Sequence, residues 1–435
     1  LLGLVNAILL LVPWQMVVAL GTYGLLVPMP GILLAGLLLR HRHLAGLDTL
    51  LYGVGAGYGC AIVLLLALSY LPGGLSGWSV IIAADLLLLT LALISWQFPW
   101  PISPSATHGH ESASIWLWAG VLTLLALAAF LRLTNLAYSE FQGDEARAIL
   151  RAAAVIQGHE DVLLLHRKGP AEILLPTSIF AVGGLIDEAS ARIPFTLANI
   201  IGCLALFRLG WRLFNPLAGW IAAMLFVVDG YFIGFARIVQ YQSLVLLAMI
   251  LVVLLLYELY RRPIFSAGPL LLAGWLLAMG IFAHYEAVLV LIPAAYLLGM
   301  TLWRNRAERK NLLFGIGWAS LIGIGALALF YVPFVRHPNF ADTFAYLTGE
   351  RIGGTLPYNN LLPFLRQTIV YSSSYYLLCI ALPILAGLVV AYWRGLGTVA
   401  AVVVTVIGLA ALSGSLFQRD WLLVAGQDWT VVPIA

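Results

Sequence analysis

The sequence predicts an all-α polytopic membrane protein. Its 435 residues are 62% hydrophobic and only 9% charged, and the mean hydropathy is +1.00. The apolar runs are continuous over about 17 to 22 residues, the length that a helix needs to cross about 30 Å of hydrocarbon. A transmembrane β-barrel would show alternating segments of about ten residues instead. The net charge of +3 is too small to indicate a nucleic-acid partner.

The apolar runs divide the chain into about 13 expected transmembrane helices. Residues 1–39 are apolar enough for two closely spaced spans. The segment GVGAGYG at 53–59 repeats the GxxxG spacing, which predicts close packing of its helix against another. The spans after residue 39 are expected at about 49–71, 79–97, 115–134, 193–213, 216–232, 242–260, 267–283, 286–302, 313–334, 371–391 and 397–417.

The basic residues fall in alternate loops, and the positive-inside rule places those loops in the cytoplasm. The segment 135–192 and the connections 229–242, 284–286 and 335–370 then lie outside. This assignment requires that the apolar piece 170–186 does not cross the membrane, and we expect it to be re-entrant or interfacial. The basic residues are Arg40, Arg42, Arg208, Arg212, Arg261, Arg262, Arg304, Arg306, Arg309, Lys310 and Arg394.

The linker 98–112 is rich in Pro and Ser and is the best candidate for a domain boundary. The chain begins with Leu1 and ends on the apolar VVPIA, so we expect residues to be missing at both ends. The three cysteines lie far apart within apolar runs, which favours packing roles over a disulfide or metal framework. They are Cys60, Cys203 and Cys379.

Charged residues gather in one segment, 135–194, between two groups of apolar spans. Because charge is costly in a bilayer, this segment is expected to face water, a partner or a reaction. We expect it to be a charged extracytoplasmic first loop that bears juxtamembrane helices. Within it, Asp144 and Glu145 are candidates for a general base at the mouth of the helix bundle. The alternative is a solvated acidic loop in which Asp144 pairs with Arg147.

Polar residues expected on the same side are candidates for binding an anion. His166 and Lys168 stand near the start of an apolar helix, where they suit a phosphate group or lipid headgroups. The acids 187–188 suit a helix N-terminus, so we expect that turn to be mainly structural, with Arg192 as the exception. The other candidates are Arg237 as a phosphate clamp, His284 and Glu286 as either a cleft pair or a buried structural pair, and Arg351 in either a lid or an ordinary loop.

Five elements occur in a fixed order: GDEA at 143–146, HRKGP at 166–170, ARIP at 191–194, WRLFNPLAGWIAA at 211–223 and ARIVQYQ at 236–242. This order resembles the GT-C membrane glycosyltransferases, in the branch of protein O-mannosyltransferases and aminoarabinose transferases, which depend on a phospholipid carrier. Each element alone is weakly specific, and the ordered set is more so. The resemblance implies a GT-C catalytic-type core at 113–335. Additional transmembrane helices and a linker precede it at 1–112, and an outer loop and C-terminal transmembrane helices follow it at 336–435.

The resemblance implies a transferase that takes a sugar from a polyprenyl-phosphate donor. The acid that activates the acceptor falls on Asp144, with Glu145 beside it, and the residues that contact the lipid phosphate fall on His166, Lys168 and Arg237. Attack at the anomeric carbon needs a base at the acceptor, and the departing phosphate needs cations. Direct displacement would invert the anomeric centre. The family also implies a bacterial or archaeal plasma membrane with the site on the extracytoplasmic face.

The sequence departs from the family pattern at two positions. Relatives commonly carry Asp five residues after the Arg of the ARxxxxD element, where this chain has Gln242, so Glu286 is a candidate to supply the acid. Arg167 stands where many relatives have Pro. No metal site is predicted, although some relatives need a divalent cation and the Asp144–Glu145 pair is a candidate to hold one.

Two other classes of protein fit the sequence. The first is a non-catalytic GT-C-like subunit of a larger membrane complex; the enzyme interpretation requires Asp144, Lys168 and Arg237 to face one cavity. The second is a transporter, which is disfavoured because no paired broken helices in two related halves are evident. The sequence leaves open the sugar and whether the acceptor is protein, lipid or glycan.

Overall fold

The computed structural model describes residues 2–12, 14–40, 46–97, 115–141, 143–261 and 267–351. The chain divides into two compact units, Leu1–Arg336 and His337–Ala435. The predicted spans 371–391 and 397–417 lie outside the described residues. In the second unit the described elements are α16 (Phe340–Ala345) and η4 (Tyr346–Arg351).

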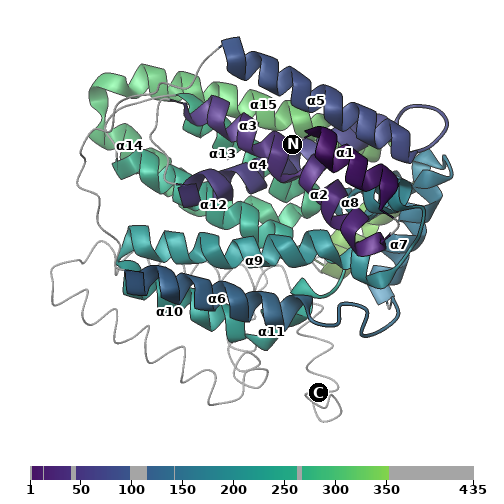
Figure 1. Cartoon of the computed structure of the whole chain (residues 1–435). Coiled ribbons are helices and arrows are strands. Elements are labelled where there is room, and N and C mark those ends of the chain that lie inside the picture. The colour runs from purple at the N-terminus through teal and green to yellow at the C-terminus, as the bar shows by residue number, and fades with distance from the viewer. Residues whose placement is uncertain are drawn as a thin grey trace. The chain divides into compact units, whose positions relative to one another are not determined.

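The first unit is a bundle of helices, with no strand among its described residues (Figure 1). The helices before the linker are α1 (Leu2–Leu11), α2 (Gln15–Leu26), α3 (Pro28–Leu39), α4 (Gly46–Ser69) and α5 (Gly77–Gln97). The helices that follow the linker are α6 (Ile115–Leu133), α7 (Gly143–Ile156), η1 (Glu160–Leu165), α8 (Ala171–Gly183), α9 (Glu188–Leu213), α10 (Pro216–Val228) and α11 (Gly230–Ala236). The remaining helices are α12 (Gln242–Arg261), α13 (Ala267–Ala283), η2 (Tyr285–Val290), α14 (Leu291–Arg304), η3 (Arg306–Glu308) and α15 (Arg309–Arg336).

Seven helices in the described residues are long and apolar enough to cross a membrane, or up to eight if the bent pair α10–α11 forms one span. The predicted class, an all-helical membrane protein, is confirmed, whereas the predicted number of about 13 spans is not confirmed. Residues 1–39 hold one segment of spanning length, Gln15–Leu39, because α1 has only 10 residues. The predicted spans 115–134 and 267–283 include shorter apolar helices, Trp118–Leu133 and Ala267–Ala283.

Close contact between backbones holds α3 against α4, as the glycine spacing predicts. A Cβ atom added to Gly57 would lie 1.8 Å from the carbonyl oxygen of Val27, and one added to Gly31 would lie 1.9 Å from the carbonyl oxygen of Gly53. Since no side chain fits in those gaps, only glycine lets the two helices approach this closely. The helices before the linker therefore pack tightly among themselves.

A buried ion network joins α4 to the later helices. Arg208 on α9 holds Asp48 in the first turn of α4 through two hydrogen bonds of 2.6 Å. Arg212 lies 3.3 Å from Asp48 and 3.3 Å from Glu258 on α12. Asp48, Arg208 and Glu258 are all buried. A charge buried without a partner is costly, so this network fixes α4, α9 and α12 relative to one another.

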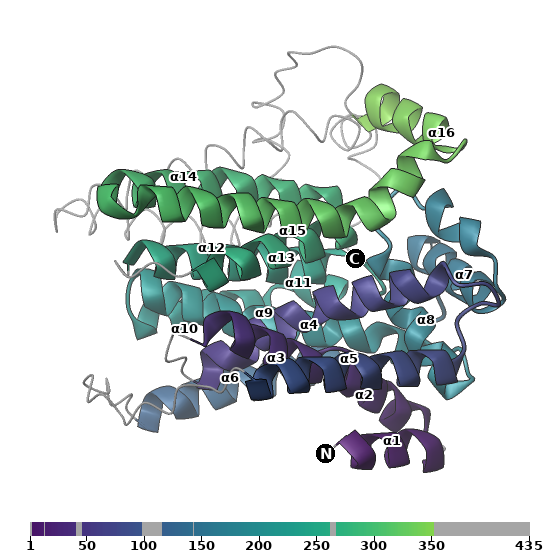
Figure 2. The ribbon, with the colours of Figure 1, turned by 90° about the horizontal axis from the view of Figure 1, so that it is seen from above.

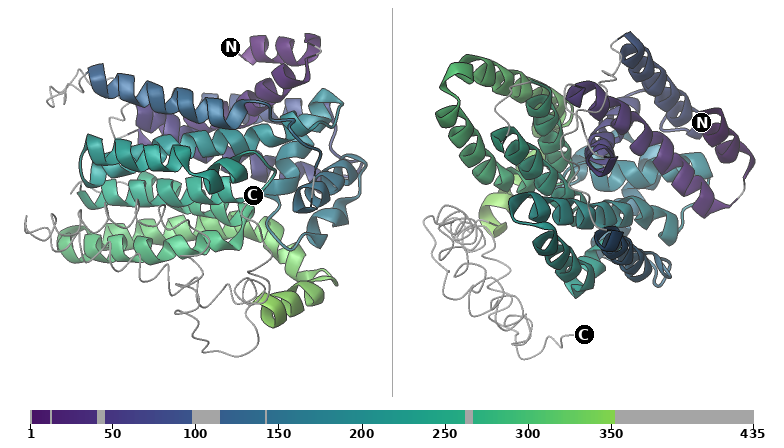
Figure 3. Two further views of the ribbon diagram at one scale, coloured as in Figure 1. Left: turned by 90° about the horizontal axis from the view of Figure 1, so that it is seen from below. Right: turned by 60° about the vertical axis from the view of Figure 1, so that its left-hand side comes forward.

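The charged segment folds into α7, η1 and α8 at one end of the bundle, as both the side view and the view from above show (Figures 1 and 2). Figure 2 shows α9, α12, α13 and α15 running lengthwise, and in the left view of Figure 3 the blue-teal charged segment again lies at one end of the long helices. The apolar face of α7 buries Ala148, Ile149, Ala152 and Val155, and α7 packs against α8. At 13 residues, α8 is about 20 Å long. That is less than the hydrocarbon thickness of about 30 Å, which favours the prediction that this piece does not cross.

The helix expected to begin near residue 193 begins at Glu188. Asp187 is its N-cap and accepts a hydrogen bond from the backbone N–H of Ser190 at 2.9 Å. Pro194 therefore lies inside the helix rather than in its first turn. The early start brings Arg192 into the helix, where its side chain is fully buried and turned toward α7.

Candidate functional site

Asp144, in the first turn of α7, forms an ion pair with Lys168 from the loop before α8. The Lys168 Nζ atom lies 3.1 Å from Asp144 Oδ2, and the Asp144 side chain is 51% exposed. Arg147 lies 3.5 Å from the other carboxylate oxygen. The predicted Asp144–Arg147 contact and the predicted proximity of Asp144 to Lys168 thus occur together. Asp144 is open to a reactant while Lys168, with a side chain 16% exposed, is held in place.

Lys168 is surrounded by acceptors on three sides. Its ammonium donates to Gln240 Oε1 at 3.3 Å and lies 3.6 Å from Glu172 Oε2. The ring of Tyr241 faces it, with the nitrogen 5.0 Å from the ring centroid. Carboxylates on two sides and an aromatic face therefore hold the Lys168 side chain in this position.

The loop that holds Lys168 rests on the end of α13. A Cβ atom on Gly169 would lie 1.8 Å from the carbonyl oxygen of Phe282, so only glycine allows this approach. His284 follows Phe282 by two residues, just after α13 ends, and is the N-cap of η2. The glycine of the HRKGP element therefore brings the Lys168 loop close to the polar residues that follow α13.

His166 is buried between Arg151 and Glu172. Arg151 Nη1 lies 2.9 Å from His166 Nδ1, and His166 Nε2 lies 3.0 Å from Glu172 Oε2. Because a guanidinium can only donate, Nδ1 must accept, and the proton of the neutral ring lies on Nε2, which donates to Glu172. Burial lowers the pKa of His166 and outweighs the opposing effect of Glu172. His166 is therefore a neutral relay between Arg151 and Glu172 near pH 7, rather than a cation.

Asp144 has a pKa below its ordinary value. Partial burial acts to raise the pKa, but the Lys168 ammonium, its hydrogen bond and the nearby Arg147 lower it, as does a hydrogen bond with Gln240. Asp144 is therefore ionised at neutral pH. An ionised, accessible carboxylate meets the first requirement for a base that accepts a proton from a hydroxyl group.

Tyr241 connects this group to the polar residues after α13. Its ring stacks on the imidazole of His284 with centroids 3.8 Å apart and planes at 8°. Its hydroxyl donates to Glu286 Oε1 at 3.5 Å. The backbone N–H of Glu286 donates to His284 Nδ1 at 3.2 Å. The predicted candidates His284 and Glu286 thus lie one residue away from Lys168, through Tyr241.

Glu145, the second predicted acid, is engaged in a buried ion pair. Arg192 Nε and Nη2 donate to its two carboxylate oxygens at 2.8 Å each, and both side chains are buried. The backbone N–H of Val239 donates to Glu145 Oε1 at 3.0 Å. Arg192 also donates to the carbonyl oxygens of Leu136 and Ser139. This geometry favours a structural role for Glu145 and Arg192, which tie α7 and α9 to the connection between α11 and α12.

Arg237 directly follows α11, and its side chain reaches the end of α6. Its guanidinium donates to the carbonyl oxygens of Leu131 and Asn135, each at 3.0 Å, and covers the ring of Tyr138 at 5.0 Å. Its hydrogen bonds within the described part of the chain go to these carbonyls, and not to Asp144 or Lys168. Asp144 and Lys168 therefore contact one another, whereas Arg237 is held elsewhere, so these contacts do not satisfy the condition that all three face one cavity.

Gln242 and Arg351 are the two remaining residues that the sequence suggested for the site. Gln242 is the first residue of α12, and its Oε1 atom is buried without a hydrogen-bond partner among the described residues. Arg351 ends η4 in the second unit, so it has no defined position relative to Asp144. The side chain of Arg351 and the position of Gln142 lie outside what the structure describes.

The principal residues missing from the sequence-based candidates are Glu172, Gln240, Tyr241 and Arg151. Glu172 and Arg151 look like ordinary helix charges in the sequence, because each partner is on another element. Gln240 and Tyr241 precede Gln242 in the ARIVQYQ element. The sequence did contain a signal for these two residues, because a polar run between two apolar helices indicates backbone groups that need hydrogen-bond partners.

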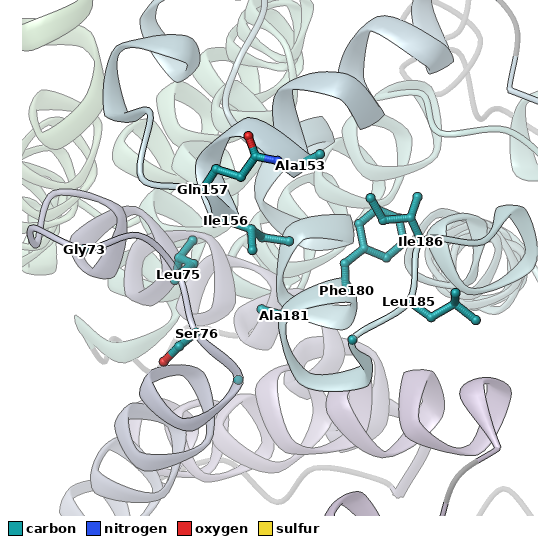
Figure 4. Close-up of a pocket in the computed structure, with 12 residues that line it drawn as sticks. Gly73, Leu75, Ser76, Ala153, Ile156, Gln157, Phe180, Ala181, Leu185 and Ile186 are labelled. Atoms are coloured by element: carbon teal, nitrogen blue, oxygen red, sulfur yellow. The ribbon is translucent and has the colours of Figure 1, made fainter.

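A cavity of about 420 Å³ lies at the other end of α7 (Figure 4). Asp144 and Gln157 are separated by the length of α7, about 20 Å. The cavity is therefore separate from the Asp144–Lys168 pair. Its lining residues are Gly73, Leu75, Ser76, Gly77, Ala153, Ile156, Gln157, Phe180, Ala181, Gly184, Leu185 and Ile186. In the described residues, no group of three or more His, Cys, Asp or Glu side chains is arranged to hold a metal ion.

Residues 169–335 match the model of a family described as dolichyl-phosphate-mannose-protein mannosyltransferase. This match confirms the predicted resemblance to the GT-C membrane glycosyltransferases. Comparisons with curated proteins and with solved structures give no match. The matched segment includes Glu172, Tyr241, His284 and Glu286 and begins directly after Lys168.

Proposed function

We propose that this protein is an integral membrane glycosyltransferase that moves a sugar from a polyprenyl-phosphate donor to an acceptor on the extracytoplasmic side of a bacterial or archaeal plasma membrane. The observation that supports it is the Asp144–Lys168 pair: an exposed, ionised carboxylate 3.1 Å from an ammonium. The reaction needs a base at the acceptor and a cation at the leaving phosphate. This pair supplies both within one contact.

In the proposed reaction, Asp144 accepts the proton of the acceptor hydroxyl as its oxygen attacks the anomeric carbon. The bond between that carbon and the phosphate oxygen breaks, and the electron pair leaves with the polyprenyl phosphate. Lys168 balances the charge that develops on the phosphate. Attack from the side opposite the leaving group inverts the anomeric centre. A polyprenyl tail suits the apolar helices of the bundle.

In this proposal, the residues near the pair contribute by holding the surrounding elements in place. Glu145 and Arg192 hold α7 in place, and Arg237 holds the end of α6, so none of them needs to touch the substrate. His284, Glu286 and Tyr241 form the wall next to Lys168. Glu286, whose carboxylate is 34% exposed, is the acid near the pair that can take the place of the Asp that relatives carry at the position of Gln242.

The test is transfer from a labelled polyprenyl-phosphate sugar in nanodiscs, comparing wild type, Asp144→Asn and Glu140→Gln. Loss of a general base should lower the rate by a factor of about 100 or more. Glu140→Gln removes an exposed carboxylate from the same loop and should leave the rate unchanged. Equal transfer by wild type and Asp144→Asn would remove Asp144 from the chemistry. No transfer by wild type with several donors would favour a non-catalytic subunit of a larger complex.

A further inference from the structure

Glu172 is a fully buried carboxylate in the first turn of α8. Three groups from two segments of the chain face it. His166 Nε2 lies 3.0 Å and Lys168 Nζ 3.6 Å from its Oε2 atom. The backbone N–H of Tyr241, just before α12, donates to its Oε1 atom at 2.8 Å. One side chain therefore joins the Lys168 loop, α8 and the start of α12.

All the groups that face Glu172 are hydrogen-bond donors. An ammonium and a backbone N–H can only donate a hydrogen bond. Because Arg151 donates to His166 Nδ1, the ring proton of His166 lies on Nε2, which also donates. A carboxylate presents acceptor oxygens only and can satisfy the three donors together. A glutamine of the same shape would turn its NH₂ group toward at least one of them. The site is thus built for a carboxylate rather than for a polar side chain in general.

Glu172 also places the other neighbours of Lys168. By binding the N–H of Tyr241 it fixes the backbone that carries Gln240 and Tyr241, whose side chains contact Lys168 at 3.3 Å and 5.0 Å. Lys168 is therefore held by Glu172 directly and through this backbone. We propose that Glu172 is a positioning residue, which holds the Lys168 ammonium beside Asp144 so that it can receive the phosphate of the lipid donor. This proposal rests on the proposed role of Lys168 in phosphate binding.

A double-mutant cycle separates positioning from general stabilisation. If Glu172 acts through Lys168, the Glu172→Gln change should matter in the wild-type background and matter little once Lys168 is Gln. If Glu172 only stabilises the fold, the two changes should act independently. The cycle uses the full-length protein in nanodiscs and two readouts, binding of polyprenyl phosphate without sugar and transfer from the labelled donor. Thr177→Val is the packing control, because Thr177 is buried on α8 and, within the described residues, its hydroxyl bonds to its own helix, at Ile173.

We expect Glu172→Gln to weaken polyprenyl-phosphate binding by at least about fivefold, and by less than about twofold in the Lys168→Gln background. Thr177→Val should bind as the wild type does. Equal effects of Glu172→Gln in both backgrounds, or wild-type binding by Glu172→Gln, would overturn the proposal. If Glu172→Gln does not fold, Glu172→Asp keeps two acceptor oxygens on a shorter side chain and enters the same cycle.

The two readouts distinguish this proposal from the proposed function. Coupled binding without any sugar transfer would support positioning by Glu172 and contradict the transferase. Transfer by wild type that is impaired by Lys168→Gln but not by Glu172→Gln would support the transferase and contradict positioning. Wild-type protein that binds no polyprenyl phosphate would contradict both.

Discussion

At the scale of single residues, Lys168 sets the acidity at which Asp144 can work. A carboxylate whose pKa is lowered stays ionised at pH values where an ordinary one becomes protonated, and loses its charge only as the pH falls through the lowered value. Replacing Lys168 by Met removes the principal cation that lowers this pKa and leaves the partial burial that raises it. The acid limb of the pH–rate profile should therefore move to higher pH in Lys168→Met.

The measurement is the pH dependence of transfer at saturating acceptor, and the shape of the profile matters rather than its height. Arg147→Gln is the matched variant, since Arg147 contacts the same carboxylate at the longer distance of 3.5 Å. Its acid limb should move in the same direction by less. An acid limb that stays in place in Lys168→Met would show that the ionisation of Asp144 does not limit the reaction.

The sequence identified several of the charged residues near the pair, but neither their partners nor their roles. Charge in an apolar chain is informative because it is costly, so Asp144, His166, Lys168 and Glu286 stand out in the sequence. Whether a charge is exposed or cancelled depends on a partner elsewhere in the chain. Glu145 differs from Asp144 by one position, yet it faces Arg192, 47 residues away. No local pattern contains that information.

At the scale of elements, the Glu145–Arg192 pair holds α7 against α9. Arg192→Met would leave the Glu145 carboxylate buried with the N–H of Val239 as its remaining strong donor. Breaking a buried pair by removing one partner costs about 3–5 kcal/mol. We expect a clearly lower melting temperature for Arg192→Met in detergent, measured by a thermal unfolding assay.

The control is the double variant Glu145→Met with Arg192→Met. Replacing both charges by apolar side chains is often close to neutral, so much of the lost stability should return. If Glu145 were instead the general base, the double variant would be stable and inactive. A single Arg192→Met variant that melts with the wild type would contradict the structural role assigned to the pair.

The sequence predicted the long helices better than their ends. Hydropathy over about 20 residues is a strong signal, and the segments that became α4, α5, α9, α12 and α15 were all expected. The span that became α9 was placed too late, at 193, although the acids 187–188 had indicated a helix N-terminus; Asp187 caps a helix that begins before the apolar run does. The 67° bend between α10 and α11 was missed as well. Its cause is the cap at Asp229, which accepts from the backbone N–H of Phe232 at 3.0 Å and starts a new helix.

At the scale of the whole molecule, the basic loops predict which face is cytoplasmic. A cysteine at Glu140, before α7, should react with a membrane-impermeant maleimide in intact cells. A cysteine at Lys310, at the start of α15, should react only after the membrane is opened. Both positions are exposed, and the test uses a background without Cys60, Cys203 and Cys379. Labelling of Lys310→Cys in intact cells would reverse or refute the assigned orientation.

The contacts that complete the charged segment also constrain the order of assembly during synthesis. Glu172 meets the N–H of Tyr241 across 69 positions of the chain, and Lys168 meets Gln240 across 72. When α7 and α8 leave the ribosome, these partners have not yet been made. Until α12 enters the membrane, Glu172 and Lys168 therefore remain in water or at the lipid headgroups. We therefore expect nascent chains arrested before α12 to keep this segment accessible to protease, and chains arrested beyond it to protect it.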